Sequence, residues 1–215
     1  MNRQFVDYCK SSICQGKKSL KANEQNEEIR AQYQEQTAAI APRRFIFIDE
    51  FGCNKSMTRL YGRAFGGDRA IGSVPSNYGT KTSVIAAMGL RGIVATMTII
   101  GSIDGPAFDG YVKSFLVSQL KKGDVIILDN YKVHLSKFAK ELIESVGAEI
   151  IFLPPYSPDL NPIENCFSKV KSVLRSVAAR TNLLLRRAVN FAFDSVIPQD
   201  IIGWFTHCGY LSPPI

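Results

Sequence analysis

The segment LPPYSPDLNPIE, residues 153–164, marks the point where a predicted strand gives way to a helix. It follows the strand-like run 150–152 and contains four prolines, which suit neither a strand interior nor a helix interior. Because proline fixes φ and lowers the entropy lost when a loop is ordered, the segment should hold Glu164 rigidly. Downstream, a helix is predicted from apolar residues at Ile163, Phe167, Val170, Leu174 and Val177.

The rest of the chain supplies the other elements of an α/β fold. Strands are expected from apolar runs at 45–50, 82–90, 92–102, 124–130 and 148–154. Further helices are expected at 102–120, 136–147 and 181–197. The glycine-rich stretch 59–80 suits short hairpin connections better than helices. Antiparallel strands followed by alternating helices and strands predict a mixed sheet with helices on both faces.

The length and composition are those of one globular domain with an appendage at its N-terminus. The chain has 215 residues, 46% of them hydrophobic, which is enough to bury a sizeable core. Residues 17–40 are rich in Lys, Glu, Gln and Ala and contain no Gly or Pro, so they read as an exposed helix or a partly ordered linker. We therefore expect an N-terminal helical or linker segment over 1–42 and the folded domain over 43–215.

The charge and the cysteines restrict the class of protein. A net charge of +7 and a pI near 9.2 indicate an anionic partner such as nucleic acid, although a basic surface that keeps the protein soluble explains them equally well. Five scattered cysteines without a C-x-x-C pair predict neither a disulfide framework nor a zinc site, and they fit a reducing cytoplasm. No run resembles a signal peptide or a membrane span.

Three carboxylates stand at the ends of predicted elements. Asp49 and Asp129 each follow a buried strand, and Glu164 begins a helix. If the two strands are parallel neighbours, the aspartates lie side by side, and each raises the pKa of the other unless a cation sits between them. Mg²⁺ prefers carboxylate oxygens, and such a set suits two-metal phosphoryl transfer. Each acid alone is also a common turn or cap residue, and Glu50 and Asp159 compete as the relevant carboxylates.

Four segments of the chain resemble one known family. They are FIDEFGCN (47–54), RLYGRAFGG (59–67), GDVIILDNYKVH (123–134) and LPPYSPDLNPIENCFSKVK (153–171). In this order they resemble the DDE transposases of the mariner-type superfamily, in the branch found in bacterial insertion sequences, over about residues 43–210. The resemblance implies an RNase H-like catalytic domain over 43–215 that cleaves and joins DNA at element ends with two Mg²⁺ or Mn²⁺ ions.

The resemblance also assigns residues to the site. It implies that Asp49, Asp129 and Glu164 are catalytic and hold the metal ions, and the interval 164 − 129 = 35 leaves 34 residues between the last two acids, a spacing that this branch uses. Asn130 and His134 match the Asp-Asn pair and nearby His of the family, where they would support the metal site or contact DNA. For His134 a role at a helix start is an open alternative.

Basic residues after Glu164 are candidate contacts for DNA phosphates. Lys169, Lys171 and Arg175 follow on the same predicted helix, although a solvated basic face explains them nearly as well. Full-length relatives carry helix-turn-helix domains upstream, and residues 1–42 show no such pattern. The chain is therefore expected to be a catalytic domain, or alternatively a non-catalytic DNA-binding remnant that partners with or inhibits full-length transposase, or a nuclease without a joining step.

The resemblance further predicts where the protein works and with what. Its partners would be DNA at element ends and at the target, with a homodimer or a full-length transposase as a possible protein partner, and no membrane. The predicted location is the cytoplasm of a bacterium, at the nucleoid when the protein is on DNA.

Overall fold

A five-stranded mixed sheet forms the centre of the computed structural model, which describes residues 22–131, 134 and 136–212. Its strands are β1 (Phe45–Cys53), β2 (Thr82–Gly89), β3 (Gly92–Ile100), β4 (Val125–Leu128) and β5 (Glu149–Phe152), in the spatial order β3-β2-β1-β4-β5. β1, β2 and β3 pair antiparallel, and β4 and β5 run parallel to β1. The predicted mixed sheet is confirmed, with the change of direction at β1.

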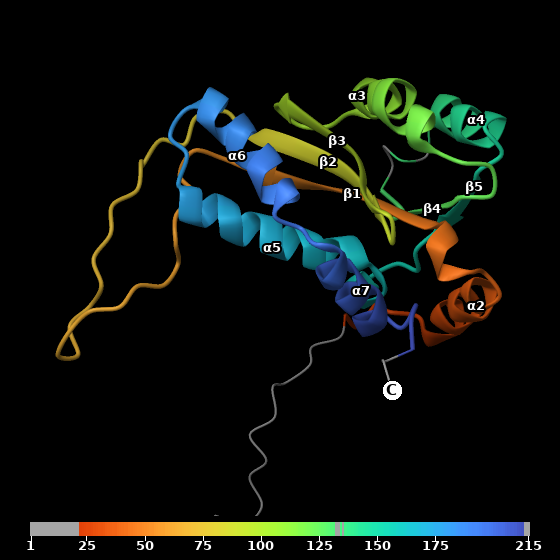
Figure 1. Cartoon of the computed structure of the whole chain (residues 1–215), viewed down its shortest axis with the longest axis horizontal. Coiled ribbons are helices and arrows are strands. Elements are labelled where there is room, and N and C mark those ends of the chain that lie inside the picture. Colours follow the sequence, from red (N-terminus) through yellow and green to blue (C-terminus); the bar gives the residue numbers. More distant parts are fainter. Residues whose placement is uncertain (1–21, 132–133, 135, 213–215) are drawn as a thin grey trace, which may run out of the picture.

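Helices cover both faces of this sheet (Figure 1). On one face lie α3 (Gly105–Tyr111) and α4 (Lys137–Ser145), and on the other lie α5 (Pro162–Val177), α6 (Asn182–Asp194) and α7 (Pro198–His207). Successive strand residues point to opposite faces, so Ile46 and Ile48 pack with Phe108, while Phe47 and Phe51 pack with the α5 side. The run 45–48 is therefore wholly apolar because both faces of β1 are buried.

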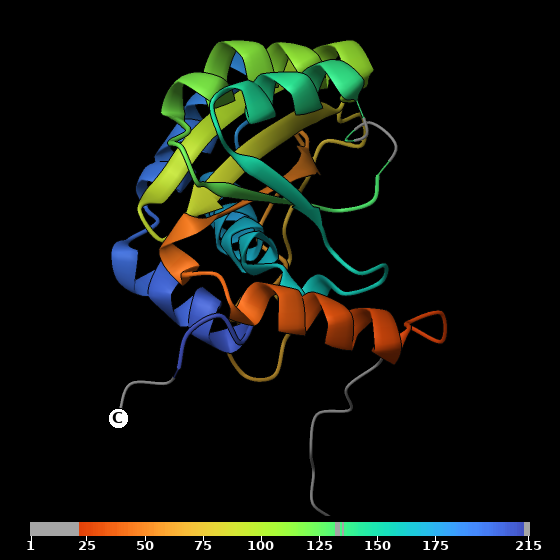
Figure 2. The same ribbon diagram turned by 90° about the vertical axis from the view of Figure 1, so that its right-hand side faces the viewer.

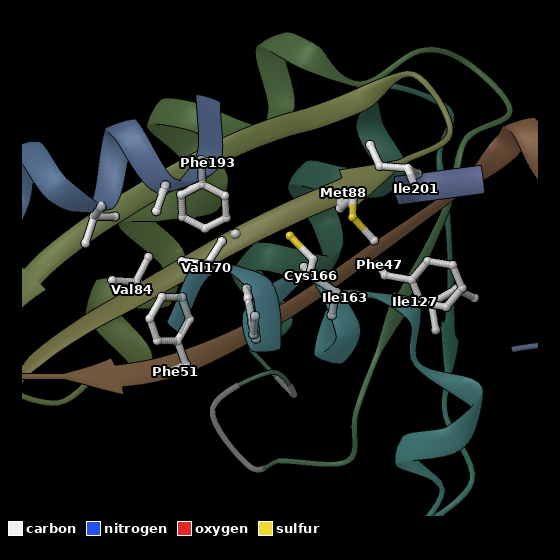
Figure 3. Close-up of a cluster of buried hydrophobic side chains, with 14 of the residues drawn as sticks. Phe47, Phe51, Val84, Met88, Ile127, Ile163, Cys166, Val170, Phe193 and Ile201 are labelled. Atoms are coloured by element: carbon white, nitrogen blue, oxygen red, sulfur yellow. The ribbon is translucent and has the colours of Figure 1, made fainter. Parts of the chain in front are cut away.

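The core between β1 and α5 places the start of α5 against the sheet. Phe51 of β1 and Phe167 of α5 have ring centroids 4.7 Å apart, and Phe167 and Val170 are fully buried. Figure 3 shows Cys166 and Ile163 of α5 packed in the same cluster. The predicted apolar stripe of this helix is confirmed, and it orients the opposite side of α5 toward solvent.

The predicted helix over 102–120 is present but irregular. Asp104 caps α3, because its carboxylate accepts a hydrogen bond from the backbone N–H of Ala107 at 3.0 Å. α3 continues as a π-helical turn, η2 (Val112–Leu116), and a 3₁₀ turn, η3 (Val117–Gln119). Val112 and Leu116 are both buried by this turn against the sheet.

Residues 54–81 form one long connection between β1 and β2, without a helix or strand of their own. The expectation of short hairpin connections in this stretch is wrong. Its apolar residues occur singly or in adjacent pairs rather than in the alternating pattern of a half-buried strand, and Tyr61 and Phe65 are exposed, so the segment has no face to bury in a sheet. Arg180 anchors its beginning by donating from Nη1 to the carbonyls of Lys55 and Met57 at 2.8 and 2.9 Å.

The upstream helix α2 (Glu27–Ala38) lies within the segment expected to be an exposed helix or linker. Asn26 caps it through two backbone N–H groups. One side of α2 is not exposed, because Arg30, Tyr33 and Thr37 are buried against the main domain. Their spacing of three and four residues is that of one helix face. The division of the chain at residue 42 stays a prediction.

The structure also shows the state of three cysteines and the absence of a membrane-spanning helix among the described residues. Cys53, Cys166 and Cys208 are buried free thiols, and Cys9 and Cys14 lie outside the described residues. Across residues 22–131, 134 and 136–212, no helix combines the length and apolar character needed to cross a lipid bilayer.

Candidate active site

The strand register brings the two aspartates to one level of the sheet. β1 pairs with β4 so that each residue lies opposite the residue 80 positions later, as in Phe47 with Ile127 (127 − 47 = 80). Asp49 and Asp129 are also 80 apart (129 − 49 = 80), just past the last paired residues. The expected parallel neighbours are confirmed, and Asp129 directly follows β4. The expectation that Asp49 follows its strand is wrong, because β1 continues to Cys53 through its antiparallel pairing with β2, so Asp49 lies within β1 just past the parallel pairing. The carboxyl ends of parallel strands are the usual place for a site in an α/β sheet.

A cleft of about 390 Å³ joins all three acids. It is lined by Asp49, Asp129 and Glu164, by Asn130 and Tyr131, and by most of the segment 153–161, which we call the proline loop. The loop ends in a 3₁₀ turn, η5 (Pro158–Leu160), and α5 then begins with Pro162 in its first turn. Glu164 therefore stands in the first turn of a helix whose start the loop determines.

Asp49 is the most buried of the three acids. Only 8% of it is exposed, and its Oδ1 and Oδ2 accept hydrogen bonds from the backbone N–H of Glu50 at 2.7 Å and from Asn161 Nδ2 at 2.9 Å. Burial and the charges of Glu164 and Asp129 together raise the pKa of Asp49 to about 7, against the opposing effect of the hydrogen bond from the backbone N–H of Glu50. Without a cation, Asp49 therefore keeps its proton up to a pH well above the one at which an ordinary aspartate ionises.

Asn161 belongs to this site, although the sequence analysis did not select it. It is 4% exposed, and while its Nδ2 donates to Asp49, its buried Oδ1 has no hydrogen-bond partner within the described residues. The position was visible in the sequence as the residue before Pro162, but an asparagine there also reads as a helix cap. In the structure its side chain caps nothing and ties the proline loop to β1 instead.

His134 connects Asp129 to Glu50. Its Nδ1 lies 2.6 Å from Asp129 Oδ1 and its Nε2 lies 3.0 Å from Glu50 Oε2. An imidazolium donates from both ring nitrogens, which suits a ring placed between two carboxylates. Burial alone would lower the pKa of His134, but the hydrogen bonds to Asp129 and Glu50 outweigh it and raise the pKa to about 9.

The same contact controls Asp129. Burial acts to raise the pKa of Asp129, but hydrogen bonds from His134 and from the backbone N–H of Tyr131 outweigh it and hold the pKa below its usual value. Both hydrogen bonds that Asp129 accepts from the described residues end on Oδ1, so Oδ2 is the oxygen available to a cation. Asp129 is thus charged and oriented, whereas Asp49 is poised to lose its charge.

The structure places His134 behind the cleft rather than on its surface. Its side chain has no exposed area, and its ring lies against Phe108 of α3 with centroids 4.8 Å apart. Ser136, not His134, caps α4 by accepting from the N–H of Ala139 at 3.3 Å. In this conformation His134 supports Asp129 through a buried contact, and a contact of His134 with DNA stays a prediction.

The other residues selected as DNA contacts are spread over several environments. Asn130 lines the cleft, where its Nδ2 donates to the carbonyl of Leu153 at 2.6 Å. Lys169 forms an ion pair with Asp200 of α7, which neutralises it. The ammonium of Lys171 lies 5.3 Å from the centre of the Phe51 ring.

The remaining candidate cation is Arg175, near the other end of α5. It lines a small hollow with Arg59, Leu60 and Tyr61 of the long connection 54–81. Of the two competing carboxylates, Glu50 points to the α3 side of the sheet, and Asp159 forms an ion pair with Arg30 of α2. Neither stands in the cleft beside Asp49.

Comparison with known proteins agrees with this geometry. Residues 44–183 of the 215 match the family model described as DDE superfamily endonuclease. The chain belongs to this family. No curated protein sequence matches the chain. The family membership confirms the coarser part of the resemblance noted above, and the branch within the family stays a prediction.

Solved structures share the fold of this DDE endonuclease domain. A crystal structure of a pre-cleavage Mos1 transpososome matches with a TM-score of 0.74 at 14% identity, over 95% of this chain and 66% of that one. A Mos1 transposase paired-end complex with left transposon end gives 0.72 at 15% identity, over 95% and 67%. A Mos1 mariner paired-end complex with Mn gives 0.71 at 12% identity, over 96% and 68%.

These similarities establish the RNase H-like fold of the DDE domain. At such identities they show the fold alone, and this chain spans about two thirds of the length of the Mos1 chains in those complexes. The predicted fold class, a mixed sheet with helices on both faces, is thereby confirmed.

The acids of the DDE domain fit a hard divalent cation in chemistry and surroundings. Carboxylate oxygens are the donors that Mg²⁺ and Mn²⁺ prefer. Burial and the repulsion from Glu164 and Asp129 raise the pKa of Asp49, and a cation would offset both effects. The unpartnered Oδ1 of Asn161 lies buried beside Asp49. As the side chains stand, no three His, Cys, Asp or Glu residues in the described parts of the chain form a group that could hold a metal ion.

Proposed function

We propose that this DDE domain is the catalytic domain of a transposase of the bacterial insertion-sequence branch, which cleaves and joins DNA at element ends. The observation that carries the proposal is the convergence of Asp49, Asp129 and Glu164 on one cleft, just past the point where the parallel pairing of β1 with β4 ends. Membership of the DDE superfamily of endonucleases supports the reaction class. The basic charge of +7 suits a DNA partner.

The proposed reaction is phosphoryl transfer with two Mg²⁺ or Mn²⁺ ions held by Asp49, Asp129 and Glu164. Bound ions of this kind activate the attacking oxygen and stabilise the leaving one. In cleavage, water attacks phosphorus and the bond to the 3′ oxygen breaks, which leaves a 3′-hydroxyl. In joining, that hydroxyl attacks a target phosphodiester and displaces the 3′ oxygen of the target strand.

The residues of this chain prepare the cleft for that reaction. His134 keeps Asp129 charged and orients its carboxylate, and the hydrogen bond from Asn161 ties Asp49 to the proline loop. On the outside of the cleft we assign DNA phosphates to Lys171 and Arg175, whereas Lys169, Asn130 and His134 are occupied by protein partners in this structure. A homodimer or a full-length transposase as partner, and a place at the bacterial nucleoid, are parts of the same proposal.

Metal removal tests the proposal directly. The wild-type chain should nick supercoiled plasmid with Mn²⁺ or Mg²⁺, lose this activity in excess EDTA, and regain it when Mn²⁺ is restored, because the acids cannot act on phosphorus without their cations. Nicking is measured as conversion of supercoiled to open-circular DNA on a gel. Nicking that survives EDTA would contradict the assignment.

The reaction products distinguish a transposase from a nuclease without a joining step and from a non-catalytic partner. A transposase yields strands joined to target DNA, whereas a nuclease stops at the nick, so a labelled element end is traced into the target. An inactive wild-type chain that lowers the activity of a full-length transposase when the two are mixed would identify a non-catalytic partner instead.

A further inference from the structure

Helix α2 lies outside the sheet but contacts the loop that shapes the cleft. Figure 2 shows α2 alongside the connection from β5 to α5, and two of its contacts end on the proline loop. Gln25, just before α2, donates from Nε2 to the carbonyl of Tyr156 at 3.1 Å. Arg30 donates from Nη1 and Nη2 to Oδ1 and Oδ2 of Asp159 at 3.0 and 2.6 Å.

A third contact runs through two tyrosines. The hydroxyls of Tyr33 and Tyr210 are 2.7 Å apart, and the hydroxyl of Tyr210 donates to the carbonyl of Leu160 at 2.8 Å. Burial raises the pKa of Tyr33 to about 12 and raises that of Tyr210 well above its usual range. Both hydroxyls therefore keep their protons, and the chain of two hydrogen bonds from α2 to Leu160 is intact.

The ion pair is the strongest of these contacts. The side chain of Arg30 is only 11% exposed, and its planar guanidinium binds both oxygens of Asp159. A bidentate pair of this kind defines a single geometry. Glu27 of α2 lies 3.6 Å from Nε of the same guanidinium and helps to orient it toward Asp159. α2 and the loop are therefore held in one relative position.

That position matters because the contacts end next to the site. Asp159 and Leu160 directly precede Asn161, which binds Asp49, and Glu164 follows three residues later. We propose that α2 is a positioning element of the active site, in which Arg30 and Tyr33 clamp the proline loop so that Asn161 and Glu164 stay over the strand ends. This inference rests on the proposed function for the roles of Asp49 and Glu164.

Hydrogen exchange of the full chain tests the clamp independently of activity. In the Arg30→Met variant, which keeps the apolar stem, the amides of Leu160 and Asn161 should exchange about tenfold faster, because their bonds to Ser157 and Pro158 open with the loop. Amides of β2 should be unchanged. Tyr33→Phe, a variant of conserved volume, should show the same pattern more weakly. Arg186→Met on the exposed side of α6 is the matched control.

Metal affinity tests the consequence for the site. Calorimetry with Mn²⁺ alone should show a dissociation constant about tenfold higher for Arg30→Met than for Arg186→Met, because the ligands are less well ordered. The Mn²⁺ concentration for half-maximal nicking should rise by a similar factor, while the rate at saturating Mn²⁺ falls less. A purely structural role would lower the melting temperature and move neither quantity at 25 °C.

The outcomes test the positioning role of α2 separately from the proposed transposase function. Unchanged exchange at Leu160 and Asn161 in both variants overturns the clamp, whether or not the wild-type chain nicks DNA. Faster exchange at these amides with no nicking by the wild type supports the clamp and overturns the proposed function. Faster exchange with unchanged Mn²⁺ affinity overturns the role of α2 in the site.

Discussion

The variant Asp49→Asn should lose metal-dependent nicking by about a thousandfold and yet melt at a higher temperature than the wild type in metal-free buffer at pH 8. The loss of activity follows because an amide cannot supply the charge that binds the cations. The gain in stability follows because Asp49 is buried among like charges, so its ionised form is costly when no cation is present.

The sign of the pH dependence makes this prediction sharper. The pKa of Asp49 is raised to about 7 in the folded chain, so the folded state binds its proton more tightly than the unfolded chain does. The stability associated with that proton is complete below the ordinary pKa and is lost as the pH rises through about 7. Asp49→Asn should therefore match the wild type near pH 4 and exceed it by about 5 °C at pH 8.

The local structure can accommodate the new amide. Asn161 donates to Asp49 from Nδ2, and its Oδ1 is buried without a partner among the described residues. If the Asn161 side chain turns over, its Oδ1 accepts from the amide introduced at position 49. The substitution thus replaces a carboxylate repelled by Glu164 and Asp129 with a neutral amide that donates a hydrogen bond to Asn161.

Asp129→Asn is the matched control for this effect. It should abolish nicking equally but lower the melting temperature at pH 8, because Asp129 is stabilised by its ion pair with His134. The measurement is thermal unfolding of the three proteins in EDTA from pH 4 to 8, with and without added Mn²⁺. Mn²⁺ should stabilise only the wild type appreciably. Equal destabilisation by both substitutions would contradict the electrostatic account of the cleft.

Replacing His134 with Ala should lower the free energy of unfolding at pH 6 by about 3 kcal/mol and reduce nicking by about a hundredfold. The variant leaves Glu50 and Asp129 without their shared cation and opens a cavity beside Phe108. Nicking falls because Asp129 loses the contact that sets its charge and orientation. Urea unfolding and plasmid nicking measure the two effects.

The contribution of His134 to stability should fall as the pH rises. The pKa of His134 is raised from 6.5 to about 9 in the folded chain, so its stabilisation is complete below pH 6.5 and is lost as the pH rises through about 9. The stability difference between the wild type and His134→Ala should therefore shrink between pH 6.5 and 10, leaving the cost of the cavity.

The second histidine of the chain provides the control for this prediction. His207 lies exposed at the end of α7, and His207→Ala should change the stability by less than about 0.5 kcal/mol at every pH. A pH-independent loss in His134→Ala would show that packing, not the paired charges, accounts for the contribution of His134.

Local patterns in the sequence were sufficient for the five strands and for the helices α3, α4, α5 and α6. Apolar runs marked β1 and β4, the hydrophobic spacing after Pro162 marked α5, and the polar residues next to these apolar stretches marked Asp49, Asp129 and Glu164. These features depend on neighbours within a few residues, and backbone geometry converts them directly into strand and helix. The long connection 54–81 failed as a hairpin prediction because glycines signal turns but not the distance between paired strands.

By itself the sequence determined the five strands, most of the helices and the positions of Asp49, Asp129 and Glu164 in or beside them, because those features depend on periodicity and chain stiffness. Only the tertiary structure decided which side chains meet. Asn161 binds Asp49 across 112 positions, His134 binds Glu50 across 84, and Arg30 binds Asp159 across 129. Such pairs depend on strand order, register and the packing of α2, to which many distant contacts contribute together, so no local pattern in the sequence encodes them.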